Sequence, residues 1–150
     1  MIEPQPESCL PGYDVVYTVT DYWDGPRKGV ANFRGRPIYY ENLFDEQTDD
    51  YSEVFMLIPI STDLFQLALE EFQIFLRWRT AFDRGEQHVR THPALPEDRH
   101  RFEEISQILQ KHLCMDRVKG IKARAEFAPL ASARHTLSDG KGLQVRWTTE

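Results

Sequence analysis

The sequence predicts an α+β fold in which a mostly antiparallel sheet of about five to six strands packs on two helices, with the helices in a single layer on one face of the sheet. Three observations lead to this prediction. Alternating apolar and polar residues occur near both ends of the chain, two longer stretches with helical periodicity lie between them, and Gly or Pro residues separate the strands. These patterns leave the order of the strands open.

The first alternating stretch covers residues 13–20 and predicts a half-buried strand. Strict alternation places Val15 and Val19 on one face and Val16 and Thr18 on the other.

Turns and apolar runs predict the next strands. The turn at residues 24–26, which contains Gly and Pro, precedes short strands at 29–33 and 38–44, joined by a tight turn at 34–35. These strands are expected to form a meander. The continuous apolar run 54–60 is typical of a central strand that is covered on both faces.

Two segments are predicted to be loops. Residues 45–53 are polar and strongly acidic, which favours a surface loop. The other predicted loop connects two strictly alternating stretches, residues 121–127 and 143–148, which are expected to pair as a hairpin. This long connection is rich in Ala, Ser, Asp and Gly. We expect that connection to be mobile.

The two helices differ in how much of their surface is apolar. The first is predicted from Asp63 to a stop at Gly85, and its polar residues form one narrow stripe, so we expect it to be sandwiched with Phe72, Phe75 and Leu76 in the core. The second is predicted over residues 97–113. It has a single apolar stripe, formed by Phe102, Ile105, Leu109 and Leu113.

Length and composition indicate a single domain. The chain has 150 residues, of which 41% are hydrophobic, so residues 13–150 are expected to form one α+β domain after an extended lead-in at 1–12. The two cysteines are too far apart in sequence to predict a disulfide framework or a zinc site. The amino-terminal segment is unlike a secretory signal, and no apolar run is long enough to span a bilayer, which together favour a cytoplasmic protein.

Charge is distributed unevenly along the chain. The net charge is −6, with fourteen acids against four bases in residues 1–75 and three acids against seven bases in residues 117–150. An acidic chain is a poor candidate for non-specific nucleic-acid binding, which needs clustered cations, but it can attract a basic protein partner. The alternative is that the two ends neutralise one another in the folded molecule.

No motif for catalysis or for a cofactor is present in the sequence. There is no Gly-x-Ser-x-Gly elbow, no dinucleotide fingerprint and no P-loop. His88 and His92 are four residues apart, but Pro93 makes a helix there doubtful, so no metal site is predicted. Residues 45–53 lack the ligand spacing of an EF-hand loop. We therefore expect no cofactor and lean away from an enzyme.

Glu71 is the most unusual residue of the first helix. Its position falls inside the apolar arc, and a buried carboxyl group needs a partner or a raised pKa. One interpretation places Glu71 at the rim of the helix, where it pairs with a sheet residue. The other places it in a pocket between the helix and the sheet, together with Tyr39 or Tyr40.

The turn near residue 24 is the best candidate for a partner-binding surface, because aromatic and Arg residues dominate interface hot spots. An ordinary hairpin with aromatic cross-strand pairs is the alternative. The predicted partner-binding residues come from this turn and from the acidic segment: Trp23, Asp24, Arg27, Lys28, Asp45, Glu46, Asp49 and Asp50.

Three functions are consistent with these patterns. The leading one is a small acidic interaction module without catalytic activity, such as an inhibitor, an immunity-type protein or an adaptor, with a protein partner that could be basic. The first alternative is a small-molecule-binding protein or enzyme with a pocket between the long helix and the sheet. The second alternative is a structural subunit whose apolar first helix is completed by self-association.

Overall fold

The computed structural model describes residues 9–130 and 142–149, and this part of the chain contains six strands and two long helices. The α+β class with an antiparallel sheet is confirmed. The strands are β1 (Asp14–Tyr22), β2 (Pro26–Phe33), β3 (Arg36–Asp45), β4 (Asp50–Pro59), β5 (Ile121–Pro129) and β6 (Leu143–Thr149). Most of the predicted lead-in, residues 1–8, and most of the predicted mobile loop, residues 131–141, lie outside the described residues.

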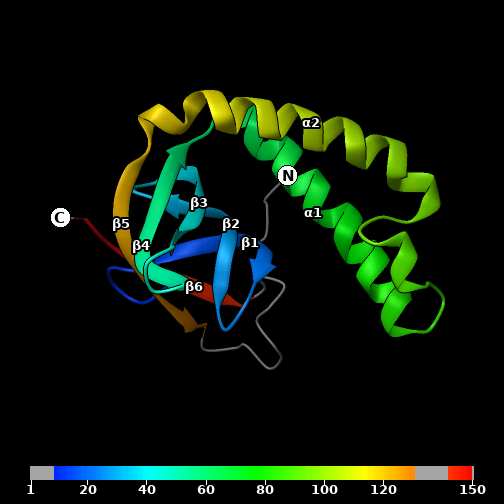
Figure 1. Cartoon of the computed structure of the whole chain (residues 1–150), viewed down its shortest axis with the longest axis horizontal. Coiled ribbons are helices and arrows are strands. Elements are labelled where there is room, and N and C mark those ends of the chain that lie inside the picture. The colour runs from blue at the N-terminus through cyan, green and yellow to red at the C-terminus, as the bar shows by residue number, and fades with distance from the viewer. Residues whose placement is uncertain (1–8, 131–141, 150) are drawn as a thin grey trace.

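The sheet closes into a barrel, which the sequence patterns did not predict. Neighbouring strands pair in chain order from β1 to β6, and β1 then pairs with β6 through Asp14 opposite Val145 and Val15 opposite Gln144. The right-handed twist of a sheet allows such closure when its apolar face curls inward. Figure 1 shows the resulting barrel with both helices on one side of it.

The barrel interior is filled by side chains from all six strands. Four aromatic rings, those of Tyr40, Phe55, Phe127 and Trp147, pack together with centroid separations of 5.8–6.1 Å. The phenol of Tyr40 donates a hydrogen bond to the Thr18 carbonyl oxygen at 2.9 Å. The buried aliphatic residues around the rings are Val16, Val19, Ala31, Ile38, Leu57, Ala123, Leu143 and Val145.

The predicted strict alternation of β1 is wrong. Val16 and Val19 both lie in the interior cluster although they are three residues apart. The pairing of β1 with β2 shifts register between Val16 and Thr18, and an irregularity of this kind lets successive residues leave the regular pattern. Thr18 is thereby free to face the helices.

Gly29 lies at a close approach of β2 to β1. A Cβ atom at this position would lie 2.1 Å from the Thr18 carbonyl oxygen and 2.6 Å from the Tyr40 hydroxyl. Only glycine fits there, because the carbonyl belongs to the backbone and cannot move aside.

The acidic segment 45–53 is a hairpin rather than the predicted surface loop. Asp45 ends β3, Asp50 begins β4, and the two are register partners. Uncharged side chains connect the two strands near the turn. The Phe44 and Tyr51 rings pack edge to face at 5.5 Å, and the Ser52 hydroxyl donates a hydrogen bond to the Leu43 carbonyl oxygen. A four-residue turn therefore remains as the loop.

The two helices form an antiparallel hairpin between β4 and β5. Helix α1 (Thr62–Asp83) begins at Ser61, whose hydroxyl accepts a hydrogen bond from the Leu64 amide, and the chain turns at Gly85 with φ +75°. Helix α2 (Arg99–Asp116) follows a short 3₁₀ turn (Pro96–Asp98), so it starts and ends slightly later than predicted.

Helix α1 is less enclosed than the sequence predicts. Phe72 is buried, but Phe75 and Leu76 are only half-buried and Phe82 is 40% exposed. Figure 1 shows why: the carboxyl-terminal half of α1 extends past the barrel and has α2 and the connecting segment as its neighbours. The distribution of apolar residues around the helix could not show how much of its length the barrel covers.

A second apolar cluster and several ion pairs hold the helical hairpin together. The cluster contains Leu64, Ile74, Ala94, Ile105 and Leu109. Two pairs on the outer side use the forked geometry of Arg on a carboxylate. Arg77 of α1 pairs with Asp98, which directly precedes α2, and Arg101 of α2 pairs with Glu70 of α1.

Candidate functional site

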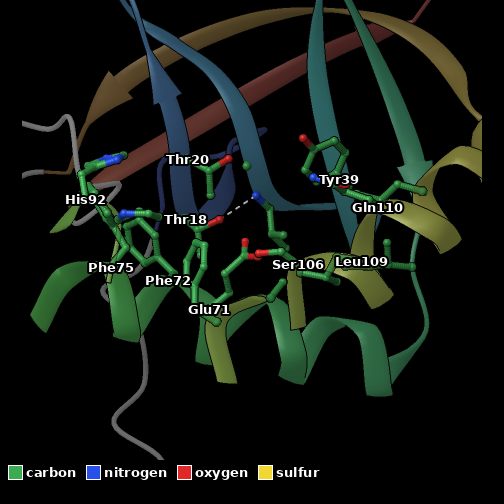
Figure 2. Close-up of a pocket in the computed structure, with 17 residues that line it drawn as sticks. Thr18, Thr20, Tyr39, Glu71, Phe72, Phe75, His92, Ser106, Leu109 and Gln110 are labelled. Atoms are coloured by element: carbon green, nitrogen blue, oxygen red, sulfur yellow. Dashed lines mark hydrogen bonds between the residues drawn. The ribbon is translucent and has the colours of Figure 1, made fainter. Parts of the chain in front are cut away.

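A cavity of about 410 Å³ lies between the outer surface of the barrel and the helical hairpin. Strands β1, β2 and β3 form one wall, α1 and α2 form the other, and the segment around His92 closes one end, as Figure 2 shows. The residues that line it are Thr18, Thr20, Gly29, Val30, Tyr39, Ile60, Ala68, Glu71, Phe72, Phe75, His92, Pro93, Phe102, Ser106, Leu109, Gln110 and Leu113.

Glu71 projects from α1 toward the barrel, so its carboxyl group lies inside this cavity (Figure 2). The Ser106 hydroxyl of α2 donates a hydrogen bond to Glu71 Oε2 at 2.6 Å. Burial raises the pKa of Glu71, and the Ser106 hydrogen bond opposes part of that rise. None of the ion pairs between described residues includes Glu71.

Tyr39 faces the cavity and Tyr40 does not. The two are adjacent in β3, so they point to opposite sides of the strand. Tyr39 lines the cavity, whereas the Tyr40 ring lies inside the barrel with no exposed surface. Of the three predicted pocket residues, Glu71 and Tyr39 line the same cavity. Tyr40 does not, because strand alternation turns its side chain into the barrel.

The field around Tyr39 is negative. Burial is the main cause of the raised pKa of Tyr39, and the charges of Glu41, Glu71 and Asp21 raise it further against the opposing charge of Arg117. The phenol of Tyr39 therefore stays protonated at neutral pH and can donate a hydrogen bond.

Apolar and aromatic side chains form most of the remaining wall. The rings of Phe72 and Phe75 come from α1, and that of Phe102 comes from α2. At one end His92 packs edge to face on Trp78, with ring centroids 4.8 Å apart, and on Phe75 at 5.7 Å. Trp78 is held in place by a hydrogen bond from its indole nitrogen to the Thr91 hydroxyl.

Ser106 is the most informative residue that the sequence interpretation missed. It lies four residues after Phe102 and three before Leu109, on the apolar stripe of α2. A serine inside an apolar stripe is unusual, and this was the feature of the sequence that could have identified Ser106 as a site residue. Thr18 was missed for another reason, because its orientation depends on the irregular pairing of β1 with β2.

Arg27 joins the two segments that supply the predicted partner-binding residues. Its guanidinium donates to the Trp23 carbonyl oxygen and to Asn42 Oδ1, each at 2.7 Å, and lies 4.4 Å from the centre of the Tyr51 ring. The β1–β2 turn and the β3–β4 hairpin are therefore joined. The Trp23 side chain stays 70% exposed on this surface.

The acidic residues of this barrel end have local roles as well. Asp45 Oδ1 accepts a hydrogen bond from the Gln47 amide, and Asp50 Oδ1 accepts one from the Tyr51 amide. Asp24 and Asp49 both adopt positive φ angles in their turns, and Glu46 and Asp49 are exposed. These acids belong to the same two turns as the exposed Trp23 and Phe44.

Lys28 makes a separate contact from that of Arg27. It follows Arg27 in β2, and its ammonium group lies 3.8 Å from a carboxylate oxygen of Glu41 in β3. Lys28 therefore pairs with Glu41, whereas Arg27 contacts the neighbouring Asn42 and the Tyr51 ring.

The described residues contain no group of three or more His, Cys, Asp or Glu side chains that could hold a metal ion. His88 accepts a hydrogen bond from the Arg90 amide through Nδ1, and His92 belongs to the cavity wall. Neither helix in this part of the chain has the length and apolar character needed to cross a membrane.

Comparisons of the chain with protein-family models, with curated proteins and with solved structures find no match.

Proposed function

We propose that this protein binds a small molecule in the cavity between the barrel and the helical hairpin. The observation that carries the proposal is Glu71, a carboxyl group that lies inside a largely apolar cavity and has a serine hydroxyl as its hydrogen-bond partner. A titratable group with a shifted pKa in a concave apolar site is a common mark of a binding site. The volume of about 410 Å³ falls within the range of roughly 300–1,000 Å³ that is usual for such sites.

The cavity is also held open by the surrounding structure. The buried cluster of Leu64, Ile74, Ala94, Ile105 and Leu109 packs the two helices against one another, while β1, β2 and β3 belong to a closed barrel. A preformed cavity loses little conformational entropy when a ligand enters.

The test is native mass spectrometry of the protein purified from its own host. We expect a retained small molecule, which Ala68→Trp should displace because Ala68 lines the cavity. Gln73→Trp is the matched control, since Gln73 is exposed on the same helix and does not line this cavity. Retention that is the same in both variants would place the molecule elsewhere and contradict the proposal.

A second function, interaction with a protein partner, is favoured by Trp23. This large side chain is 70% exposed on a turn that Arg27 holds in place, and Tyr22 and Phe44, both from the strand ends beside these turns, are 45% and 51% exposed. Exposed aromatic residues on turns that also contain acidic residues suit a basic partner. Trp23 would supply the buried contact, and the acids would speed association by attracting the partner.

Kinetic measurements on a partner captured from host lysate would test this second function. Trp23→Ala should mainly raise the dissociation rate, with a loss above about 2 kcal/mol for a hot spot. The triple variant D45N/D49N/D50N should slow association at low salt, and the difference should shrink as salt shortens the Debye length from about 10 Å at 0.1 M. Binding that is indifferent to both changes would exclude this surface.

The self-associating subunit predicted from the apolar α1 remains a prediction. Light scattering on the full chain decides it, because a monomer at micromolar concentration is incompatible with a subunit that needs a second copy.

A further inference from the structure

We propose that the ligand of the cavity is an organic cation, a compact molecule in which a primary or secondary ammonium group is joined to an apolar or aromatic body. This inference rests on the proposed function, because it names the chemical class that would occupy the same cavity.

The first argument is the charge of the cavity wall. Glu71 supplies a carboxyl group, and the described residues that line the cavity include no Lys or Arg. A carboxylate or phosphate ligand would meet a like charge there without a countercharge. An ammonium ion would instead supply the countercharge that a buried carboxylate requires.

The second argument is the free hydrogen-bonding capacity of Glu71. Ser106 occupies Oε2, and no hydrogen bond from another described residue reaches Oε1. A carboxylate accepts several hydrogen bonds, so Oε1 can take an N–H of the ligand. Thr20 and Tyr39 also line the cavity, and their hydroxyl groups add polar surface to a largely apolar wall (Figure 2).

The third argument is the negative field on the barrel side. Asp21, Glu41 and Glu71 all act on Tyr39 in the same direction. Glu41 is partly neutralised by Lys28 and Arg117, which pair with it. Asp21 and Glu41 of the barrel therefore act on this end of the cavity in the same direction as Glu71 of α1, which favours a cation over a neutral ligand there.

The fourth argument is the aromatic wall. Phe72, Phe75 and Phe102 contribute rings from the helices, and Tyr39 contributes one from the barrel. Aromatic faces attract ammonium groups through their quadrupole, and they also accommodate an apolar body. The same wall would therefore bind both ends of the proposed ligand.

Calorimetric titration of the full chain with three probes of similar size tests the proposal: 2-phenylethylamine, 2-phenylethanol and 3-phenylpropanoate. We expect the amine to bind at least roughly tenfold more tightly than the alcohol, because its hydrogen bond to Glu71 is charge-assisted. The carboxylate should bind most weakly of the three.

Glu71→Gln should remove the preference for the amine while leaving affinity for the alcohol nearly unchanged. Glu70→Gln is the matched control, because Glu70 is the neighbouring residue but pairs with Arg101 on the outer side of the hairpin. It should leave the preference intact. Loss of the preference in E70Q but not in E71Q would overturn the assignment.

The pH dependence gives a second readout. Amine affinity should rise as the pH increases through the raised pKa of Glu71, because the carboxyl group becomes charged, and fall again where the ligand loses its proton. The other titratable side chains facing the cavity are Tyr39, which stays neutral in this range, and His92. Repeating the series in His92→Gln separates the contribution of the imidazole.

The outcomes distinguish the two proposals. Equal affinity for amine and alcohol, with both lost in Ala68→Trp, would overturn the cation assignment and leave small-molecule binding intact. Preferred binding of 3-phenylpropanoate would likewise overturn it. Failure of all three probes to bind, together with no retained molecule in the protein from its host, would overturn both proposals.

Discussion

Two aromatic-lined regions lie on opposite sides of strands β1, β2 and β3. Inside the barrel the rings of Tyr40, Phe55, Phe127 and Trp147 pack together among buried aliphatic side chains, and the phenol of Tyr40 has a backbone partner. Outside it, between the barrel and the helices, similar rings surround about 410 Å³ of unfilled volume and a carboxyl group. The comparison shows that aromatic side chains of the same kinds fill a core on one side of the strands and leave an open volume on the other.

The largest stability loss is expected inside the barrel. Phe55 is 5% exposed and contacts three other rings, so Phe55→Ala should lower the free energy of unfolding by about 3–5 kcal/mol through loss of contacts and formation of a cavity. Urea denaturation at neutral pH measures it. A loss below about 1 kcal/mol would mean that the interior repacks and is not a filled core.

Gly29 lies in the wall that the two regions share, and Gly29→Ala should cost about 2–3 kcal/mol. The new methyl group would meet the Thr18 carbonyl oxygen and the Tyr40 hydroxyl, so β1 and β2 would have to separate. Gly35→Ala is a useful contrast, because that turn glycine has open space around it and suffers only from its positive φ of 78°. If Gly35 proved the more sensitive position, the close approach would not limit packing.

Phe75→Ala should cost less than Phe55→Ala, at about 1–2 kcal/mol, although it removes the same side chain. Phe75 is only half-buried and already borders unfilled volume. The same denaturation assay on both variants gives the difference directly. Equal losses of stability would mean that Phe75 is packed as fully as Phe55 and does not border an open volume.

Glu71→Gln should stabilise the unliganded protein at neutral pH, by less than the cost of Phe75→Ala. Burial raises the pKa of Glu71 above its unfolded value of 4.5, so the folded chain holds this proton more tightly than the unfolded chain does. Wild-type stability therefore falls as the pH rises from the unfolded value through the folded one, and stays lower above it.

Denaturation between about pH 4 and pH 8 measures this difference, because the variant lacks the titrating group. The gain from Gln should be smallest at the acidic end and largest at the alkaline end. A gain that is greatest at acidic pH would mean that ionised Glu71 is stabilised by a partner.

Trp23→Ala should have the smallest effect on stability, within about 0.5 kcal/mol, because its side chain is mostly exposed and belongs to neither aromatic region. Arg27 holds this turn through the Trp23 backbone carbonyl, which the substitution retains. A larger loss would show that the indole packs on the barrel.

Local patterns predicted most of the secondary structure. Alternation identified β5 and β6, and Ser61, Asp63 and Gly85 lie near the ends of α1, whose capping chemistry is contained in a few neighbouring residues. Barrel closure could not be predicted in this way, because Asp14 and Val145 are 131 positions apart and their pairing depends on the accumulated twist of all six strands.

The candidate site was partly predictable for a similar reason. Glu71 stood out because a carboxyl group interrupted an apolar arc, which is a property of one helix. The choice between Tyr39 and Tyr40 required knowledge of which face of β3 points inward. Ser106 needed the packing of α1 against α2, since its role is visible only beside Glu71.

The connection of the helical hairpin to the barrel has a consequence for how a molecule could enter the cavity. The chain leaves the barrel after β4 and returns at β5, and these strands are neighbours, with Leu57 and Ile121 as register partners. The hairpin is therefore an insertion whose two ends are attached to two neighbouring strands of the barrel. Tilting it outward would break side-chain contacts but no backbone pairing of the barrel. Such an opening would be a local event, with a free energy below that of global unfolding.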